Sequence, residues 1–355
     1  MGSLRNICVS LLLPALAAAA EAPTAVVVSA GGGDYVRAIG GTVAKLAADG
    51  FQVYVIQVAN DEKNSVRLGP AETRLSSDAD AARAARALGV TELFSLNHQS
   101  GELAQVSSNE LRNQLTVLIR TWKPQKLFFP DPYVHYTPEW DQFFTGRAAE
   151  ETNYSNSGSF LYEFARAGLK GYSVPETYYY AVGRPYRPGE GGHNGARMEK
   201  FNITPLMARK RAAVAELRTA NRAYAEHTRA RLAAAGTPLG PLATLTDATA
   251  ADLAIAWVDE LSAAVGARYG LPSAAQSPPH PAAPGDNRPP PAWSEARARP
   301  LPSQSRPPDR REAFLWQGPG AFFDPGRVGG FFAGGGTVVV EVLCVGEAVG
   351  GAVGG

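Results

Sequence analysis

The chain has few cysteines and almost no net charge. Of its 355 residues only Cys8 and Cys344 are cysteines, and Cys8 lies in an N-terminal segment that we expect to be removed. A single remaining cysteine excludes a disulfide framework within the mature chain. The 34 basic residues nearly balance the 33 acidic ones, so the composition gives no reason to expect nucleic acid or an anionic membrane as a partner.

The sequence also lacks a comfortable membrane span near its start. The apolar run from Ile7 to Ala20 is short, follows Arg5, and ends in small residues before Glu21. This pattern is typical of a secretory signal peptide, the alternative being a buried helix. We therefore expect residues 1–22 to be cleaved, the protein to be secreted or periplasmic, and the mature chain to have no membrane span.

Strand-like and helix-like segments alternate through the first 130 residues. Hydrophobic residues make up 45% of the chain, enough to fill a sizeable core. We expect strands at residues 25–29, 51–58, 92–96 and 126–129, with helices between them, the last helix capped by Asn109. This alternation predicts right-handed crossovers and an α/β fold, Rossmann-like, with a mostly parallel sheet and helices on both faces.

The second half of the chain alternates less regularly. It predicts a strand at 176–182, one long helix from Thr204-Pro205 to about Ala235, and a further helix at about 248–265. Between residues 272 and 308, 12 of 37 residues are proline, which is typical of disordered segments. We expect one domain at residues 24–270 and a Pro/Gly-rich disordered or low-complexity tail at 271–355, to which the sequence assigns no function.

The first predicted strand ends in three glycines and a carboxylate, Gly31-Gly32-Gly33-Asp34. In open α/β sheets, ligands bind in the crevice beyond the carboxyl ends of the strands. Glycine permits a tight turn or the close approach of a ligand at such a position. The sequence therefore predicts a functional crevice around Asp34.

Five features, in order along the chain, resemble the PIG-L/LmbE family of zinc-dependent N-deacetylases (GlcNAc-PI de-N-acetylase-like) over about residues 24–225. They are the Gly-Gly-Thr of residues 40–42, the Asn-Asp of residues 60–61, residues 84–90, the Phe-Phe-Pro-Asp-Pro-Tyr of residues 128–133, and residues 201–204. The resemblance implies hydrolysis of N-acetyl groups of N-acetylglucosamine conjugates by a metal-activated water.

The zinc-binding motif of the family is degenerate in this chain. The family carries Ala-His-Pro-Asp-Asp, in which the histidine and the second aspartate bind zinc and the first aspartate is the general base. Alignment on the Gly-Gly pair places the histidine at Gly31, the base at Gly33 and the second aspartate at Asp34. The third zinc ligand falls within residues 140–142, where there is no histidine.

These replacements predict an impaired or non-catalytic member. Catalytic zinc normally has three protein ligands and one water, and Asp34 alone would not hold it. Without the metal, neutral water is a poor nucleophile toward an amide. The leading hypothesis is therefore an exported protein of this fold whose partner is a sugar conjugate or another small molecule.

Two other hypotheses remain open from the sequence. In the first, Asp34, His135 and Asp141 form a rearranged site for zinc or another divalent metal, with Glu139 as a weak candidate for the base. The alternative interpretation is purely structural: His135 and Asp141 are ordinary loop residues, and Asp34 caps the following helix. In the second hypothesis, Gly31–Gly33 bind a nucleotide or phosphate, although Val36 stands where the fingerprint has its third glycine.

Overall fold

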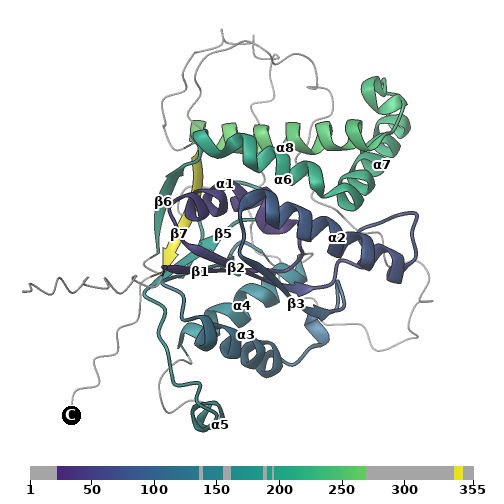
Figure 1. Ribbon diagram of the computed structural model, residues 1–355. Helices are drawn as coiled ribbons and strands as arrows, with labels where there is room; N and C mark the ends of the chain where they lie inside the picture. The colour runs from purple at the N-terminus through teal and green to yellow at the C-terminus, as the bar shows by residue number, and fades with distance from the viewer. Residues whose placement is uncertain are drawn as a thin grey trace, which may run out of the picture.

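The computed structural model describes residues 22–135, 139–154, 161–186, 190–193, 196–268 and 340–346. Within these residues one sheet of seven strands runs through the molecule in the order β3-β2-β1-β4-β5-β7-β6 (Figure 1). The strands are β1 (Thr24–Ser29), β2 (Gln52–Ala59), β3 (Glu92–His98), β4 (Lys126–Pro130), β5 (Glu176–Tyr180), β6 (Arg197–Asn202) and β7 (Val340–Gly346).

Helices cover both faces of the sheet. In Figure 1, α3 and α4 lie below it, and α1, α2, α6, α7 and α8 lie above it. The helices are α1 (Asp34–Ala48), α2 (Pro70–Leu88), α3 (Ser108–Trp122), α4 (Trp140–Tyr154), α5 (Tyr162–Arg166), α6 (Met207–Glu216), α7 (Arg218–Ala234) and α8 (Asp247–Arg268).

The first five strands are parallel, as the alternation of the sequence predicts. β1 pairs with β2 and β4, β2 with β3, and β4 with β5, all in parallel. Val26 and Val28 are buried in the core under α3, whereas Ala25 and Val27 are buried in the core under α1. Because both faces of the strand are covered, its apolar run is continuous rather than alternating.

β7 completes the sheet from a distant part of the sequence. It lies between β5 and β6 and pairs antiparallel with both. The sequence of residues 340–346 has no reliable strand periodicity, and these residues fall within the tail expected at 271–355. The remaining residues of the expected tail, and residues 1–21 of the expected signal peptide, lie outside the described residues.

Glu341 of β7 forms a buried ion pair with Lys210 of α6. The side chains are 4% and 1% exposed, and Lys210 Nζ lies 2.5 Å from Glu341 Oε1. The same carboxylate accepts the backbone N–H groups of Gly41 and Thr42 at 2.9 and 2.5 Å. Those N–H groups lie in the middle of α1, so a strand carboxylate acts there as a helix cap.

A kink in α1 explains why these mid-helix groups are available. Ile39 has non-helical backbone angles (φ −125°, ψ 21°), and the helix continues beyond it. Lys210 Nζ donates to the carbonyl oxygen of Ala38 at 3.3 Å, while Glu341 receives the N–H groups on the other side. The ion pair therefore supplies a donor for the backbone carbonyl and an acceptor for the backbone N–H groups that flank the kink.

The long helix expected from residue 204 is in fact two helices. α6 ends before Leu217, which has φ −78° and ψ 53°, and α7 begins directly after it. Asp80 of α2 accepts the N–H of Thr219 at 2.6 Å, and the Asn221 side chain donates to the carbonyl oxygen of Val214 at 2.7 Å. These contacts satisfy the backbone groups at the break, which helical periodicity alone does not reveal.

Two smaller points complete the fold. α3 begins at Ser108 with Ser107 in the capping position, so the prediction that Asn109 caps it is wrong by two residues. None of the helices that the structure describes combines the length and the apolarity needed to cross a lipid bilayer.

Candidate functional site

The carboxyl ends of β1 and β2 meet at the predicted crevice. Ser29 and Gln57 are partners in the parallel register, so the glycine loop after β1 lies beside the turn after β2. Asp61 in that turn has a left-handed backbone (φ 55°) and is 8% exposed. This conformation directs the chain so that the Asp61 carboxylate lies against the glycine loop.

Asp61 occupies the space in which a side chain at position 31 would lie. A Cβ added to Gly31 would come within 2.5 Å of Asp61 Oδ1, closer than real Cβ contacts allow. The N–H of Gly32 donates to Asp61 Oδ2 at 2.7 Å, and Gln57 Nε2 donates to the same oxygen at 3.2 Å. The backbone of Gly31 is not in the left-handed conformation, so the backbone itself would accept a histidine there. The obstacle to a histidine side chain is the Asp61 carboxylate.

The other two glycines are packed as well. A Cβ on Gly32 would lie 2.8 Å from the Cβ of Ala81 in α2, and one on Gly33 would lie 3.2 Å from Leu217 Cδ1. Ala81 of α2 thus occupies the room that a side chain at position 32 would need, whereas a side chain at position 33 would require a small shift of Leu217 at the α6–α7 break. The loss of the motif is accommodated by the surrounding packing.

Asp34 contacts Gln142, which lies within the window 140–142 in which the resemblance implies the third ligand. Its Oδ2 accepts the N–H of Gly31 at 2.9 Å and the side-chain amide of Gln142 at 3.3 Å. Gln142 lies in the first turn of α4. The structure therefore brings together two expected ligand positions, as a carboxylate and an amide. Asp34 does not cap α1, since the capping residue is Gly33 and no side chain caps there.

The two carboxyl groups beside the glycine loop perturb one another. Burial raises the pKa of Asp34. Burial, followed by the charge of Asp34, raises the pKa of Asp61 to about 7, while Arg37 acts in the opposite direction. Like charges in a poorly solvated site disfavour simultaneous ionisation. Near neutral pH, Asp61 is therefore protonated in a large fraction of molecules.

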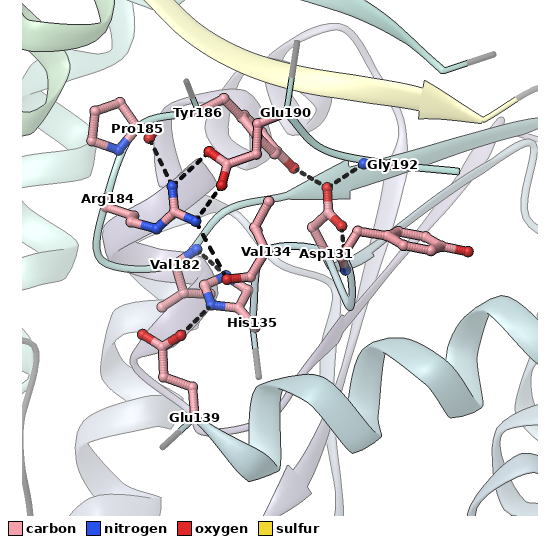
Figure 2. A network of polar contacts seen from close by, with 11 residues as sticks. Asp131, Val134, His135, Glu139, Val182, Arg184, Pro185, Tyr186, Glu190 and Gly192 are labelled. Atoms are coloured by element: carbon pink, nitrogen blue, oxygen red, sulfur yellow. Dashed lines mark hydrogen bonds and ion pairs between the residues drawn. The ribbon is translucent and has the colours of Figure 1, made fainter. Parts of the chain in front are cut away.

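His135 is fully buried, and both of its ring nitrogens have partners (Figure 2). Nδ1 lies 3.0 Å from Glu139 Oε2, and Nε2 accepts the N–H of Val182 at 2.7 Å. An Nε2 that accepts a hydrogen bond has its lone pair directed at that amide, so Nδ1 carries the proton toward Glu139. In this arrangement neither nitrogen faces a metal, and Glu139 orients the histidine.

A larger polar network surrounds His135 and was not predicted from the sequence. Asp131, fully buried, accepts the hydroxyl of Tyr186 at 3.0 Å and the N–H of Gly192 at 2.6 Å. Arg184 forms a two-pronged ion pair with Glu190 at 2.7 and 2.8 Å (Figure 2). The network ties the segments after β5 to the loop after β4. Asp131 belongs to the Phe-Phe-Pro-Asp-Pro-Tyr stretch, the one signal that could have revealed it.

Asp141 has a separate structural role. Its carboxylate accepts the N–H groups of Gly101 and Leu103 at 2.6 and 3.4 Å. These bonds attach the start of α4 to the loop after β3 and so place Gln142. Among the described residues, no three His, Cys, Asp or Glu side chains are gathered where they could hold a metal ion. The structure therefore does not assemble Asp34, His135 and Asp141 into the rearranged site.

The donor set beside the glycine loop does not fit the zinc that the family implies. It consists of the carboxylates of Asp34 and Asp61 and the amide of Gln142, with no nitrogen or sulfur ligand. Catalytic zinc sites use three protein ligands that leave one position open. Here each carboxylate already accepts backbone and side-chain N–H groups, so the side chains are directed toward one another.

The glycine loop also does not present its amides to a phosphate. The N–H groups of Gly31 and Gly32 donate to Asp34 and Asp61 respectively. Phosphate sites of this kind need free N–H groups at a helix N-terminus. Two carboxyl groups occupy that place here and accept both N–H groups, so these amides are not available to an anion.

Five parallel strands, helices on both faces and a crevice at the carboxyl ends of the strands define an α/β protein of the Rossmann-like class. Residues 26–151 match the family model described as PIG-L, GlcNAc-PI de-N-acetylase. These residues form a PIG-L family domain, and the resemblance inferred from the sequence is confirmed over this part of the chain. No curated protein matches the chain.

Several solved structures are similar to the chain. N,N′-diacetylchitobiose deacetylase from Pyrococcus horikoshii, complexed with its inhibitor MPG, shares 25% identity over 56% of this chain and 71% of that chain, with a TM-score of 0.49. GalB, the 4-carboxy-2-hydroxymuconate hydratase from Pseudomonas putida KT2440, shares 18% identity over 60% and 89%, with a TM-score of 0.45. The zinc-inhibited form of teicoplanin deacetylase Orf2 shares 15% over 59% and 93%, with a TM-score of 0.42.

Proposed function

We propose that this PIG-L domain binds a sugar conjugate, or a related small molecule, without hydrolysing its N-acetyl group through a metal-bound water. The observation that carries the proposal is the Asp61 carboxylate in the space beside Gly31, where a zinc-binding imidazole would stand. The polar groups of Asp34 and Gln142 remain at the crevice, and Trp140, 43% exposed, begins the same helix as Gln142. Such groups can bind the hydroxyls and the flat faces of a sugar.

The chemistry of the crevice supports the loss of activity. Amide hydrolysis needs an activated water and a base of suitable pKa, and positioned general bases contribute about 10²–10⁴-fold. Gly33 supplies no base, and the His135–Glu139 pair is bonded within the loops. Binding without turnover follows from a site that keeps polar contacts but lacks the activating groups.

We expect wild-type protein to contain far less than one zinc ion per chain, because the crevice offers no nitrogen or sulfur ligand and its carboxylates already accept N–H groups. A variant carrying Gly31→His, Asp61→Ala and Gln142→His together should bind about one, since it provides two imidazoles beside Asp34. The matched control carries Gly31→His and Gln142→His but keeps Asp61, whose carboxylate occupies the imidazole's place, and should bind no more zinc than the wild type. Metal content is measured by mass spectrometry after dialysis.

Binding and turnover of N-acetylglucosamine conjugates separate the proposal from its alternative. Titration calorimetry should show binding that weakens in Asp34→Ala and Trp140→Ala, while acetate release stays at background. Stoichiometric zinc in the wild type, lost in Asp34→Ala, would overturn the proposal. Acetate release that disappears in Asp34→Ala and His135→Ala would instead support the rearranged hydrolase.

We also propose that the protein is exported to the periplasm or the exterior. The proposal rests on the short apolar run at residues 7–20 and the small residues at its end, before Glu21. Mass spectrometry of protein recovered outside the cytoplasm should show a chain lacking residues 1–22. Recovery of the chain only in the cytoplasm, with residues 1–22 intact, would contradict export.

A further inference from the structure

β3 is the end strand of the sheet and is only partly covered: Leu93 and Leu96 pack against the two cores, and Phe94 makes an edge contact with Trp122 of α3. Its outward edge pairs with no other strand among the described residues (Figure 1). No residue from Glu92 to His98 is buried, although parallel sheets are normally covered on both faces. The strand therefore presents unpaired backbone groups and the side chains of both faces at the same edge.

Two large apolar side chains are exposed along this edge, among polar ones. Phe94 is 39% exposed, and Leu75, on the neighbouring α2, is 64% exposed. Between α2 and β3 lies an open pocket of about 350 Å³, lined in part by Ala82, Leu93 and Ser95. Small side chains on α2 leave this space, so the helix does not seal the strand.

Before Asn97, where the backbone is left-handed (φ 59°) and the pairing register with β2 is irregular, the edge has little of the usual protection against pairing. Natural edge strands carry lysine, proline or inward-pointing charges that discourage another strand. The sequence Glu-Leu-Phe-Ser-Leu-Asn-His of β3 has a single acidic charge, Glu92, at its beginning. The middle of the strand is free of charge and of proline.

Opposite charges without ion-pair partners lie at the two ends of β3. Within the described part of the chain, Glu92 forms no ion pair. At the other end, Arg74 of α2 contacts Asn97 Oδ1 at 3.5 Å. Arg74 also forms no ion pair there, and its buried Nε has no hydrogen-bond partner. Glu92 thus lies at the start of the edge and Arg74 at its end, where Asp78 of α2 interacts electrostatically with Arg74.

We propose that two copies of this chain associate through β3, antiparallel about a two-fold axis. In that arrangement the start of one strand lies against the end of the other, so Glu92 of each copy faces the partner's Arg74. A parallel pairing would place Glu92 against Glu92. The two-fold contact uses the same surface twice and closes after two copies. It covers Phe94 and Leu75 and pairs the free backbone edge.

The first test is the molar mass of the purified full-length chain in solution. Light scattering after gel filtration, with sedimentation velocity across a range of concentrations, should show a dimer. Phe94→Glu should shift the species to monomer, because it places a charge in the middle of the pairing. Tyr162→Glu is the matched control: Tyr162 is a 64% exposed aromatic on α5, away from β3, and its variant should stay dimeric.

Charge reversal tests the antiparallel orientation. Glu92→Arg and Arg74→Glu should each weaken the dimer by about tenfold or more, and the two together should restore it, because the pair then has the reversed polarity. Circular dichroism confirms that each variant is folded. A wild-type chain that is monomeric at every concentration, or a Phe94→Glu variant that stays dimeric, would overturn the dimer. Failure of the double reversal to recover association would overturn the antiparallel pairing.

Discussion

Replacing Glu341 with glutamine should lower the free energy of unfolding by about 3–5 kcal/mol. The substitution leaves the Lys210 ammonium buried without a counter-ion, which is the costly way to break a buried ion pair. Lys210 is 1% exposed and Glu341 4% exposed, so solvent screens the pair little. Chemical denaturation of the full chain, followed by circular dichroism, measures the loss.

The two members of the pair should respond unequally. Lys210→Met removes the ammonium but leaves Glu341 bonded to the N–H groups of Gly41 and Thr42, so it should cost less than Glu341→Gln. The double variant should cost less than the sum of the single variants, because it leaves no unpaired charge. A non-additive change in the free energy of unfolding indicates that the two side chains interact. A general loss of packing would give additive changes.

A neighbouring surface pair provides the control. Arg211, the next residue of α6, pairs with Asp259 at 3.0 Å, but the side chains are 47% and 35% exposed. Exposed pairs contribute about 0–1 kcal/mol, so Asp259→Asn should change stability little. If Glu341→Gln is as mild as Asp259→Asn, then β7 does not hold α1 as described.

The second large effect is a loss of stability with rising pH that depends on Asp61. The folded chain raises the pKa of this carboxyl from an ordinary 3.8 to about 7, by burial and by the charge of Asp34. The native state therefore holds the proton more tightly than the unfolded state. The corresponding stability is fully present below about pH 3.8 and is lost as the pH rises through about 7.

The size of this effect follows from the shift in pKa, at about 1.4 kcal/mol per unit, and amounts to about 4 kcal/mol across the window. Asp61→Asn cannot ionise, so its advantage over the wild type should grow steadily between pH 4 and pH 7. Denaturation curves at several pH values measure it. Asp34→Asn removes the like charge that raises the pKa of Asp61, so the pH range in which this stability is lost should shift to lower pH. A difference between Asp61→Asn and wild type that does not change with pH would contradict the coupling.

The parallel half of the fold could be predicted from the sequence because its signals are local. Continuous apolar strands followed by helical periodicity specify the order β1 to β4, and Gly89 ends α2 with a left-handed backbone, as a helix terminus favours. The antiparallel end could not be predicted. The acidic Glu341 suggests a solvated position, and its partner Lys210 lies 131 residues away.

The sequence predicts which family residues the candidate site lacks. It does not predict which side chains occupy their places. Counting residues located the missing imidazole at Gly31 and placed a ligand position near Gln142, which does contact Asp34. The intrusion of Asp61 depends on one left-handed backbone conformation after β2. Nothing in the pattern around residue 61 distinguishes that conformation from an ordinary polar turn, and the same holds for the bonds that engage both nitrogens of His135.

The position of β7 also has a consequence for biosynthesis. Among the described strands, β6 joins the sheet only through β7, so residues 197–202 gain this partner only when residues 340–346 have emerged from the ribosome. Throughout that interval the nascent chain exposes an open flank on β5 and an unpaired ammonium at Lys210. Such a chain depends on chaperones or on rapid translation, since unpaired strand edges are sites of misassembly.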